Sequence, residues 1–177
     1  MSIPTGTYVI DPAHSELGFS VRHSGIAKVR GRFDGVEGTI ALADSLADST
    51  ATVSIDAASV STGSEQRDGH LISPDFWDAE NNPTWTFEST SVEGDGEEFT
   101  LNGDLTINGV TQPVALDVEY NGAATDAFGN DRAGFSASTE ISRKDYGLTW
   151  NVALEGGGLL VGDKVKIAIE VSAIKQA

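Results

Sequence analysis

Hydrophobic and polar residues alternate with a period of two along most of the chain. Val114, Leu116, Val118 and Tyr120 form the clearest set, with polar or small residues between them. Further alternating segments of this kind begin at Leu17, Ala51, Trp85, Phe99, Ala133 and Val165. Because the side chains of a strand point alternately to its two faces, each segment is predicted to be a strand with one buried and one exposed face. About eight such strands, with no helix between successive strands, indicate an antiparallel sheet.

Pairs of residues that favour tight turns separate several of these segments. Asn108-Gly109 follows Ile107 and is the strongest hairpin signal, because both central positions of a type I′ turn need a positive φ. Asp34-Gly35, Asp95-Gly96 and Asn121-Gly122 predict further tight connections. Short serial connections fit a barrel or a sandwich and favour an up-and-down barrel. The predicted fold is therefore an all-β, eight-stranded antiparallel barrel, formed by residues 1–177 as a single domain.

One stretch, residues 62–82, departs from the alternation and is predicted to be a helical insertion. Thr62-Gly63-Ser64-Glu65 fits a capping box, with two turns of helix over residues 66–72. Ser73 and Pro74 then fit the N-cap and first position of a second short helix that reaches Trp77. Such an insertion between strands could cover the barrel mouth as a lid.

The chain is strongly acidic, with 11 Lys and Arg against 27 Asp and Glu and a net charge of −16. A surface of this charge repels phosphate backbones, so we expect no nucleic-acid partner. Four basic residues nevertheless gather where the chain has no acid between Leu17 and Phe33, namely Arg22, Lys28, Arg30 and Arg32. They form either a patch for an anionic headgroup or membrane surface, or a solvated face that relieves the overall repulsion.

No sequence motif indicates catalysis, a metal or a cofactor. The chain has no cysteine, and residues 134–138 resemble a nucleophile elbow but lack its final glycine and lie in a predicted strand. His14, His23 and His70 do not have the spacing of a ligand set, so no metal site is predicted. The N-terminus lacks the basic and apolar regions of a signal peptide, and the longest apolar run has four residues, so we expect a cytoplasmic protein.

Seven short motifs occur along the chain. They are YVIDPAHS at residues 8–15, FSVRH at 19–23, GRF at 31–33, GTI at 38–40, RDGHLISPDFWDA at 67–79, GDLTINGVT at 103–111 and ISRKDYGL at 141–148. Together they resemble the YceI-like family of bacterial polyisoprenoid-binding proteins. The motifs lie in the family's order and span nearly the whole chain. The resemblance implies a lipocalin-like barrel with a long apolar pore that holds an isoprenoid chain or a similar amphiphile.

The resemblance, combined with strand parity, predicts which residues contact a ligand. The candidates for contact with the apolar tail are Phe19, Val21, Phe33, Phe76, Trp77, Trp85, Phe87, Leu105, Phe135 and Trp150. The candidates around the mouth, or as anchors of the lid, are His14, His23, Arg67 and His70.

The predicted function is binding, storage or transport of a long apolar lipid, most simply a polyisoprenoid of quinone or polyprenyl type. Each CH₂ group moved out of water contributes about 0.8 kcal/mol, so a long tail binds without charged contacts. Two alternatives remain open: a ligand-free structural or stress-related interaction module, and an enzyme that uses a histidine as general base on the bound lipid. The sequence also leaves open whether the protein contacts a membrane surface transiently and whether it forms a homodimer.

Overall fold

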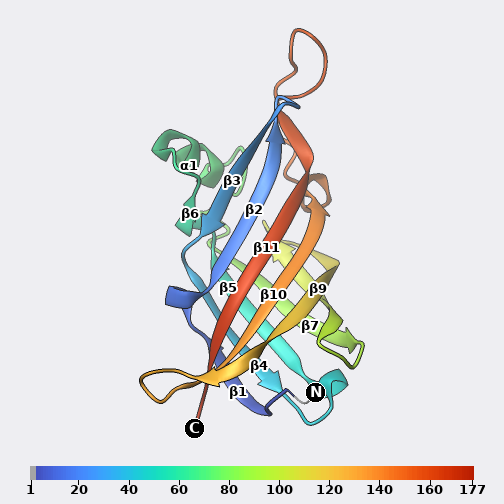
Figure 1. The fold of residues 1–177 in the computed structure, drawn as a ribbon. Helices are drawn as coiled ribbons and strands as arrows, with labels where there is room; N and C mark the ends of the chain where they lie inside the picture. Colours follow the sequence, from blue (N-terminus) through green and yellow to red (C-terminus); the bar gives the residue numbers. More distant parts are fainter. Residues whose placement is uncertain (1–2) are drawn as a thin grey trace.

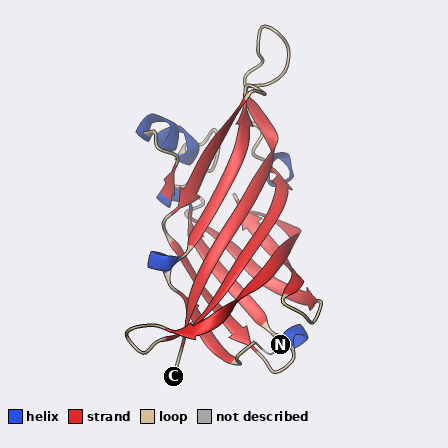
Figure 2. Ribbon diagram, in the orientation of Figure 1, coloured by secondary structure: helices blue, strands red, loops and turns tan. Residues whose placement is uncertain are grey.

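All strands belong to one antiparallel sheet in the computed structural model, which describes residues 3–177. The strands are β1 (Gly6–Ile10), β2 (Glu16–His23), β3 (Ala27–Phe33), β4 (Val36–Leu42), β5 (Thr50–Asp56), β6 (Val60–Ser61), β7 (Thr84–Glu93), β8 (Glu98–Ile107), β9 (Val110–Thr125), β10 (Asp131–Ser142) and β11 (Val161–Lys175). The helices are α1 (Glu65–Ile72) and the 3₁₀ turns η1 (Pro12–His14), η2 (Leu46–Asp48), η3 (Ala57–Ser59) and η4 (Arg143–Tyr146). Figure 1 shows the strands wound around a common axis, and Figure 2 shows how little of the chain is helical.

The sheet closes on itself because both β1 and β2 pair with β11. Three of the barrel's long strands are each interrupted once. The first runs from β1 past η1 into β2, the second from β3 past Asp34-Gly35 into β4, and the third from β5 past η3 into β6. When each interrupted pair is counted as one strand, the sheet is an eight-stranded closed antiparallel barrel. The predicted fold class is confirmed.

The inward-facing side chains of the alternating strands line the barrel interior, and two glycines allow aromatic rings to lie close against the wall. A Cβ atom at Gly103 would lie 2.4 Å from the ring of Phe87, and one at Gly31 would lie 2.4 Å from the ring of Phe19. Because no side chain larger than hydrogen fits beneath these rings, both positions require glycine.

The predicted turns are partly confirmed. Asn108 (φ 54°) and Gly109 (φ 74°) form the β8–β9 hairpin turn, and Asp95-Gly96 lies in the β7–β8 connection. Asn121-Gly122 is instead inside β9, where Gly122 pairs with Gly134 and Tyr120 pairs with Phe135. Asn121 is therefore the extra residue of a β-bulge, so the predicted turn is wrong. Asp34-Gly35 only bends the chain between β3 and β4, which continue in the same direction.

The insertion at residues 62–82 contains one α-helix where two were predicted. Ser64, rather than Thr62, is the N-cap, and its Oγ accepts a hydrogen bond from the Arg67 N–H. Ser73 is the C-cap of α1, and the following residues form turns instead of a second helix. The amides of Trp77 and Ala79 donate to the last carbonyls of α1, at Leu71 and Ile72, so the chain folds back over the helix end.

The helices described over residues 3–177 include none with the length and apolar character needed to cross a membrane.

Candidate functional site

An apolar cavity of about 250 Å³ lies inside the barrel. Its lining runs the length of the molecule: Val21 and Val161 lie toward the β2–β3 hairpin, and Leu46 and Val92 lie toward the other end. Aliphatic and aromatic side chains make up nearly all of the wall. The polar residues in the lining are Ser49, Thr50, Thr139 and Arg143.

Four aromatic rings from distant parts of the chain form one cluster on this wall. Phe33 is the centre, with ring centroids 5.6 Å from Phe19, 5.3 Å from Trp77 and 5.0 Å from Trp85. The two indoles meet edge to face at 5.1 Å. The Nε1–H group of Trp85 is buried and has no hydrogen-bond partner within residues 3–177. The cluster therefore offers apolar surface, with the unpaired Trp85 N–H enclosed within it.

Most of the predicted tail contacts lie on the cavity wall. Those in the lining are Phe19, Val21, Phe33, Phe76, Trp77, Trp85, Phe87, Leu105 and Phe135. Their contact with a ligand stays a prediction. Trp150 is outside the lining and packs behind it, with ring centroids 5.2 Å from Phe76 and 4.7 Å from His70.

None of the four predicted polar contacts is part of the lining. Two of them hold the 62–82 segment together: Arg67 donates to the hydroxyl and carbonyl of Thr62, and His70 Nε2 lies 2.9 Å from Asp75 Oδ2. His23 ends β2 and is exposed, with Nδ1 3.4 Å from the Ser24 hydroxyl.

His14 lies at the kink between β1 and β2, and its predicted role at the mouth or as an anchor of the lid stays a prediction. It belongs to η1, and its Nδ1 is 2.7 Å from Asp11 Oδ2. The same carboxylate accepts a hydrogen bond from Arg132, which also binds Asp126, so the group fixes the kink between β1 and β2 against the β9–β10 hairpin. Hydrogen bonds from Arg132 and then His14 lower the pKa of Asp11. His14 therefore stabilises the η1 turn.

Arg143 is a cavity residue that sequence reasoning missed. Its side chain is buried in η4, and its guanidinium donates to the carbonyls of Leu148, Trp150, Val161 and Gly162. Burial lowers the pKa of Arg143, while the nearby Asp163 acts in the opposite direction. The available signal was parity, because position 143 continues the inward series of Phe135, Ala137, Thr139 and Ile141.

This site presents an apolar interior and few chemical groups. The lining contains no histidine or carboxylate, and residues 3–177 contain no cluster of three or more His, Asp or Glu side chains placed to hold a metal ion. The arrangement can bury a long apolar chain, and Arg143, the one charged residue of the lining, has its guanidinium bound to backbone carbonyls.

Comparison with known proteins identifies relatives in sequence and solved structures of similar fold. A Vibrio cholerae UPF0312 protein is 36% identical over 156 residues, which cover 84% of this chain and 82% of the relative. The crystal structure of Burkholderia cenocepacia BcnA has a TM-score of 0.79 at 21% identity and covers 92% of this chain and 98% of BcnA. A polyisoprenoid-binding domain from Saccharophagus degradans, implicated in plant cell wall breakdown, has a TM-score of 0.73 at 16% identity and covers 98% of this chain and 100% of that domain.

The YceI-like domain model matches residues 8–173, which include every strand of the closed barrel except the outermost residues of β1 and β11. The chain belongs to the YceI-like domain family.

Proposed function

We propose that the protein binds one long apolar lipid, of polyisoprenoid type, inside the barrel and carries or stores it. The observation that supports this proposal most strongly is the cavity, whose apolar lining extends from Val21 and Val161 to Leu46 and Val92. Its volume of about 250 Å³ is slightly below the roughly 300–1,000 Å³ of ordinary small-molecule sites. A narrow, extended cavity of this size fits a single slender chain better than a broad ligand.

Burial of the tail supplies the binding free energy in this proposal. A tail that buries ten CH₂ groups gains about 8 kcal/mol, and the loss of chain and rotational freedom offsets part of that gain. The similarity to the polyisoprenoid-binding domain of S. degradans supports an isoprenoid over a straight acyl chain.

We propose binding without turnover, in the cytoplasm. General acid–base catalysis needs a titratable group within hydrogen-bond reach of the reacting atom, and the lining offers neither an imidazole nor a carboxylate. A histidine-dependent enzyme would therefore have to act on a headgroup outside the cavity wall.

Native mass spectrometry of the purified protein, before and after delipidation and reloading with a polyprenol, tests the proposal. The matched variants are Ala137→Trp, which points a large ring into the cavity, and Ala168→Trp, which places the same ring on the outer face of neighbouring β11. We expect a one-to-one lipid adduct in the wild type and in Ala168→Trp, and at least a tenfold weaker adduct in Ala137→Trp. A wild-type protein that stays at its bare mass and takes up no polyprenol would favour the packed interaction module.

A further inference from the structure

Three exposed apolar side chains gather at one end of the barrel. Ile26 is 88% exposed at the β2–β3 turn, and Val152 and Leu159 are 46% and 49% exposed in the loop of residues 151–160. The N–H of Ser24 donates to the carbonyl of Leu160 at 2.7 Å, so the turn and the loop are held together. We call these two segments, residues 24–26 and 151–160, the tip surface. They project together at the top of Figure 1.

The strands directly below the tip surface carry basic residues that have no role in the proposed lipid binding. Arg22 and Lys28 are register partners on β2 and β3, and Arg30 lies on the same outward face. All three side chains are exposed, and none makes an ion pair with any residue in the range 3–177. In a protein with a net charge of −16, this is a local cationic surface that complements an anionic one.

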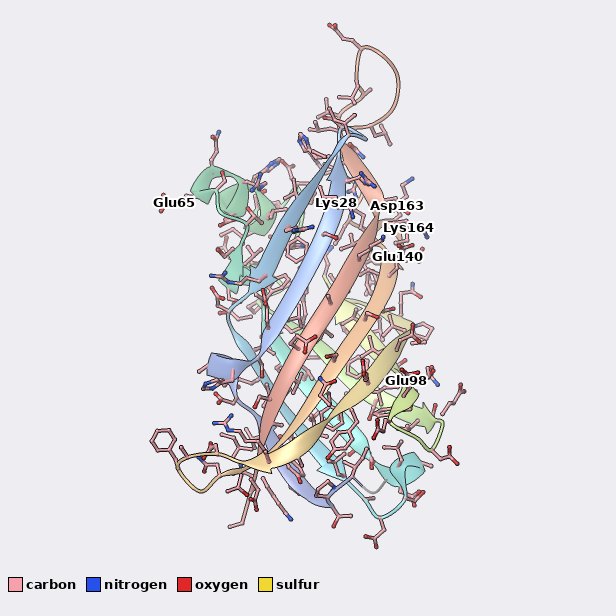
Figure 3. All side chains as sticks on the ribbon, in the orientation of Figure 1. Lys28, Glu65, Glu98, Glu140, Asp163 and Lys164 are labelled. Atoms are coloured by element: carbon pink, nitrogen blue, oxygen red, sulfur yellow. The ribbon has the colours of Figure 1, made fainter. Side chains whose placement is uncertain are left out.

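The groups that face this cluster from β11 and β10 are of both signs. Figure 3 shows Lys28 and Lys164 at the same upper end of the barrel, together with Asp163 and Glu140. Asp163 accepts hydrogen bonds from the Ser142 hydroxyl and the Lys144 N–H, and Glu140 is the register partner of Lys166. Asp163 is therefore engaged by local donors and Glu140 lies opposite a lysine, while Arg22, Lys28 and Arg30 remain available.

The cavity reaches the base of the tip surface. Val21 and Val161 are part of its lining, Val161 pairs with His23, and Ser24 follows directly. A planar partner held against residues 24–26 and 151–160 would thus lie close to this end of the cavity. The partner that combines an anionic surface with an apolar layer beneath it is a lipid bilayer.

We infer that the tip surface docks on an anionic lipid bilayer, with Ile26, Val152 and Leu159 entering the interface and Arg22, Lys28 and Arg30 contacting headgroup phosphates. The inference rests on the proposed function, because docking here would bring the cavity to the membrane from which a lipid is taken. At 0.1 M salt the Debye length is about 10 Å, so the charges near the tip surface act on the bilayer while more distant carboxylates are screened. Nearby are the cations Arg22, Lys28 and Arg30, opposed by Glu155 in the loop and Asp163 at the start of β11.

Sedimentation with vesicles tests the inference, using the full chain, phosphatidylcholine vesicles and vesicles that also contain phosphatidylglycerol. Each basic residue near an anionic surface changes the partition constant about fivefold, so Arg22→Gln, Lys28→Gln and Arg30→Gln combined should lower it about 100-fold. Ile26→Ser should lower it about tenfold. The matched control is Phe128→Ser, because Phe128 is 90% exposed at the β9–β10 hairpin, at the opposite end of β11.

Docking is supported when the wild type and Phe128→Ser bind the phosphatidylglycerol vesicles alike, while Ile26→Ser and the triple Gln variant bind about tenfold and about 100-fold more weakly. Equal binding to both vesicle types, or an equal loss in Phe128→Ser and Ile26→Ser, would overturn it. The inference would also be overturned if the wild type does not bind vesicles and sedimentation velocity instead shows a dimer that Ile26→Ser abolishes. Polyprenol uptake by the same variants separates the two proposals: tip variants that fail to dock should still load lipid, whereas a wild type that docks but never loads refutes only the carrier function.

Discussion

Truncation of Arg143 should destabilise the protein because one buried guanidinium satisfies four carbonyl groups. The four distances are 2.8 Å to Gly162, 2.8 Å to Leu148, 2.9 Å to Trp150 and 3.2 Å to Val161. In Arg143→Ala the buried carbonyl of Leu148 loses its hydrogen-bond donor, which costs about 1–3 kcal/mol. The other three acceptors are half-buried, and water replaces part of what they lose.

Relief of the guanidinium's own desolvation opposes these losses, so we expect a net fall in the free energy of unfolding of about 3 kcal/mol. With a urea m-value of about 2 kcal/mol/M, the unfolding midpoint should move down by about 1.5 M. Arg143→Lys keeps the charge but offers three donors from a single nitrogen, and it should recover only part of the loss.

The control for this experiment is Lys144→Ala, which removes the neighbouring exposed cation and should change stability by less than about 0.5 kcal/mol. Hydrogen exchange should show faster exchange over residues 148–162 in Arg143→Ala, since this arginine joins the two ends of that loop. A loss below about 1 kcal/mol in Arg143→Ala, with unchanged exchange, would refute the reasoning by showing that water fully replaces the guanidinium.

Two further predictions concern acid stability and a close contact in the barrel wall. Hydrogen bonds from Arg132 lower the pKa of Asp11 and Asp126, so their stabilisation is present above about pH 4 and is lost as the pH falls through the lowered values. Asp126→Asn should therefore show a smaller loss of stability than the wild type in urea unfolding between about pH 4 and pH 2, and parallel losses would contradict this. Gly103→Ala places a Cβ 2.4 Å from the ring of Phe87 and should cost about 1–3 kcal/mol in thermal unfolding. Combination with Phe87→Leu should recover part of that cost, whereas strict additivity would argue against the clash.

The period-two pattern predicted most of the barrel because it acts locally: each strand buries one face, and register follows from which residues are apolar. The β8–β9 turn was predictable for the same reason, since Asn108-Gly109 carries its own backbone preference. Asn121-Gly122 has a similar local preference and became a bulge, because pairing with β10 continues on both sides of it. Tertiary pairing there overrides the turn signal.

The site was predictable where it depends on strand parity, and less so where it depends on contacts between distant segments. Parity placed Phe19, Phe87 and Phe135 on the cavity wall, where the structure also has them. It had no information on Trp150, which packs behind the wall against His70 of α1 and Phe76. Arg143 was overlooked because a charged residue is rarely buried, and the carbonyls that satisfy it come from a loop whose path the sequence does not show.

The sequence by itself determined the class of fold, the inward and outward faces of its strands and the local excess of cations on β2 and β3, since each of these is a property of neighbouring residues. Only the tertiary structure decided that β1 and β2 both pair with β11, that an apolar cavity remains inside, and that residues 24–26 lie beside residues 151–160. These features depend on contacts across more than a hundred residues of chain, and such contacts form only when the barrel closes.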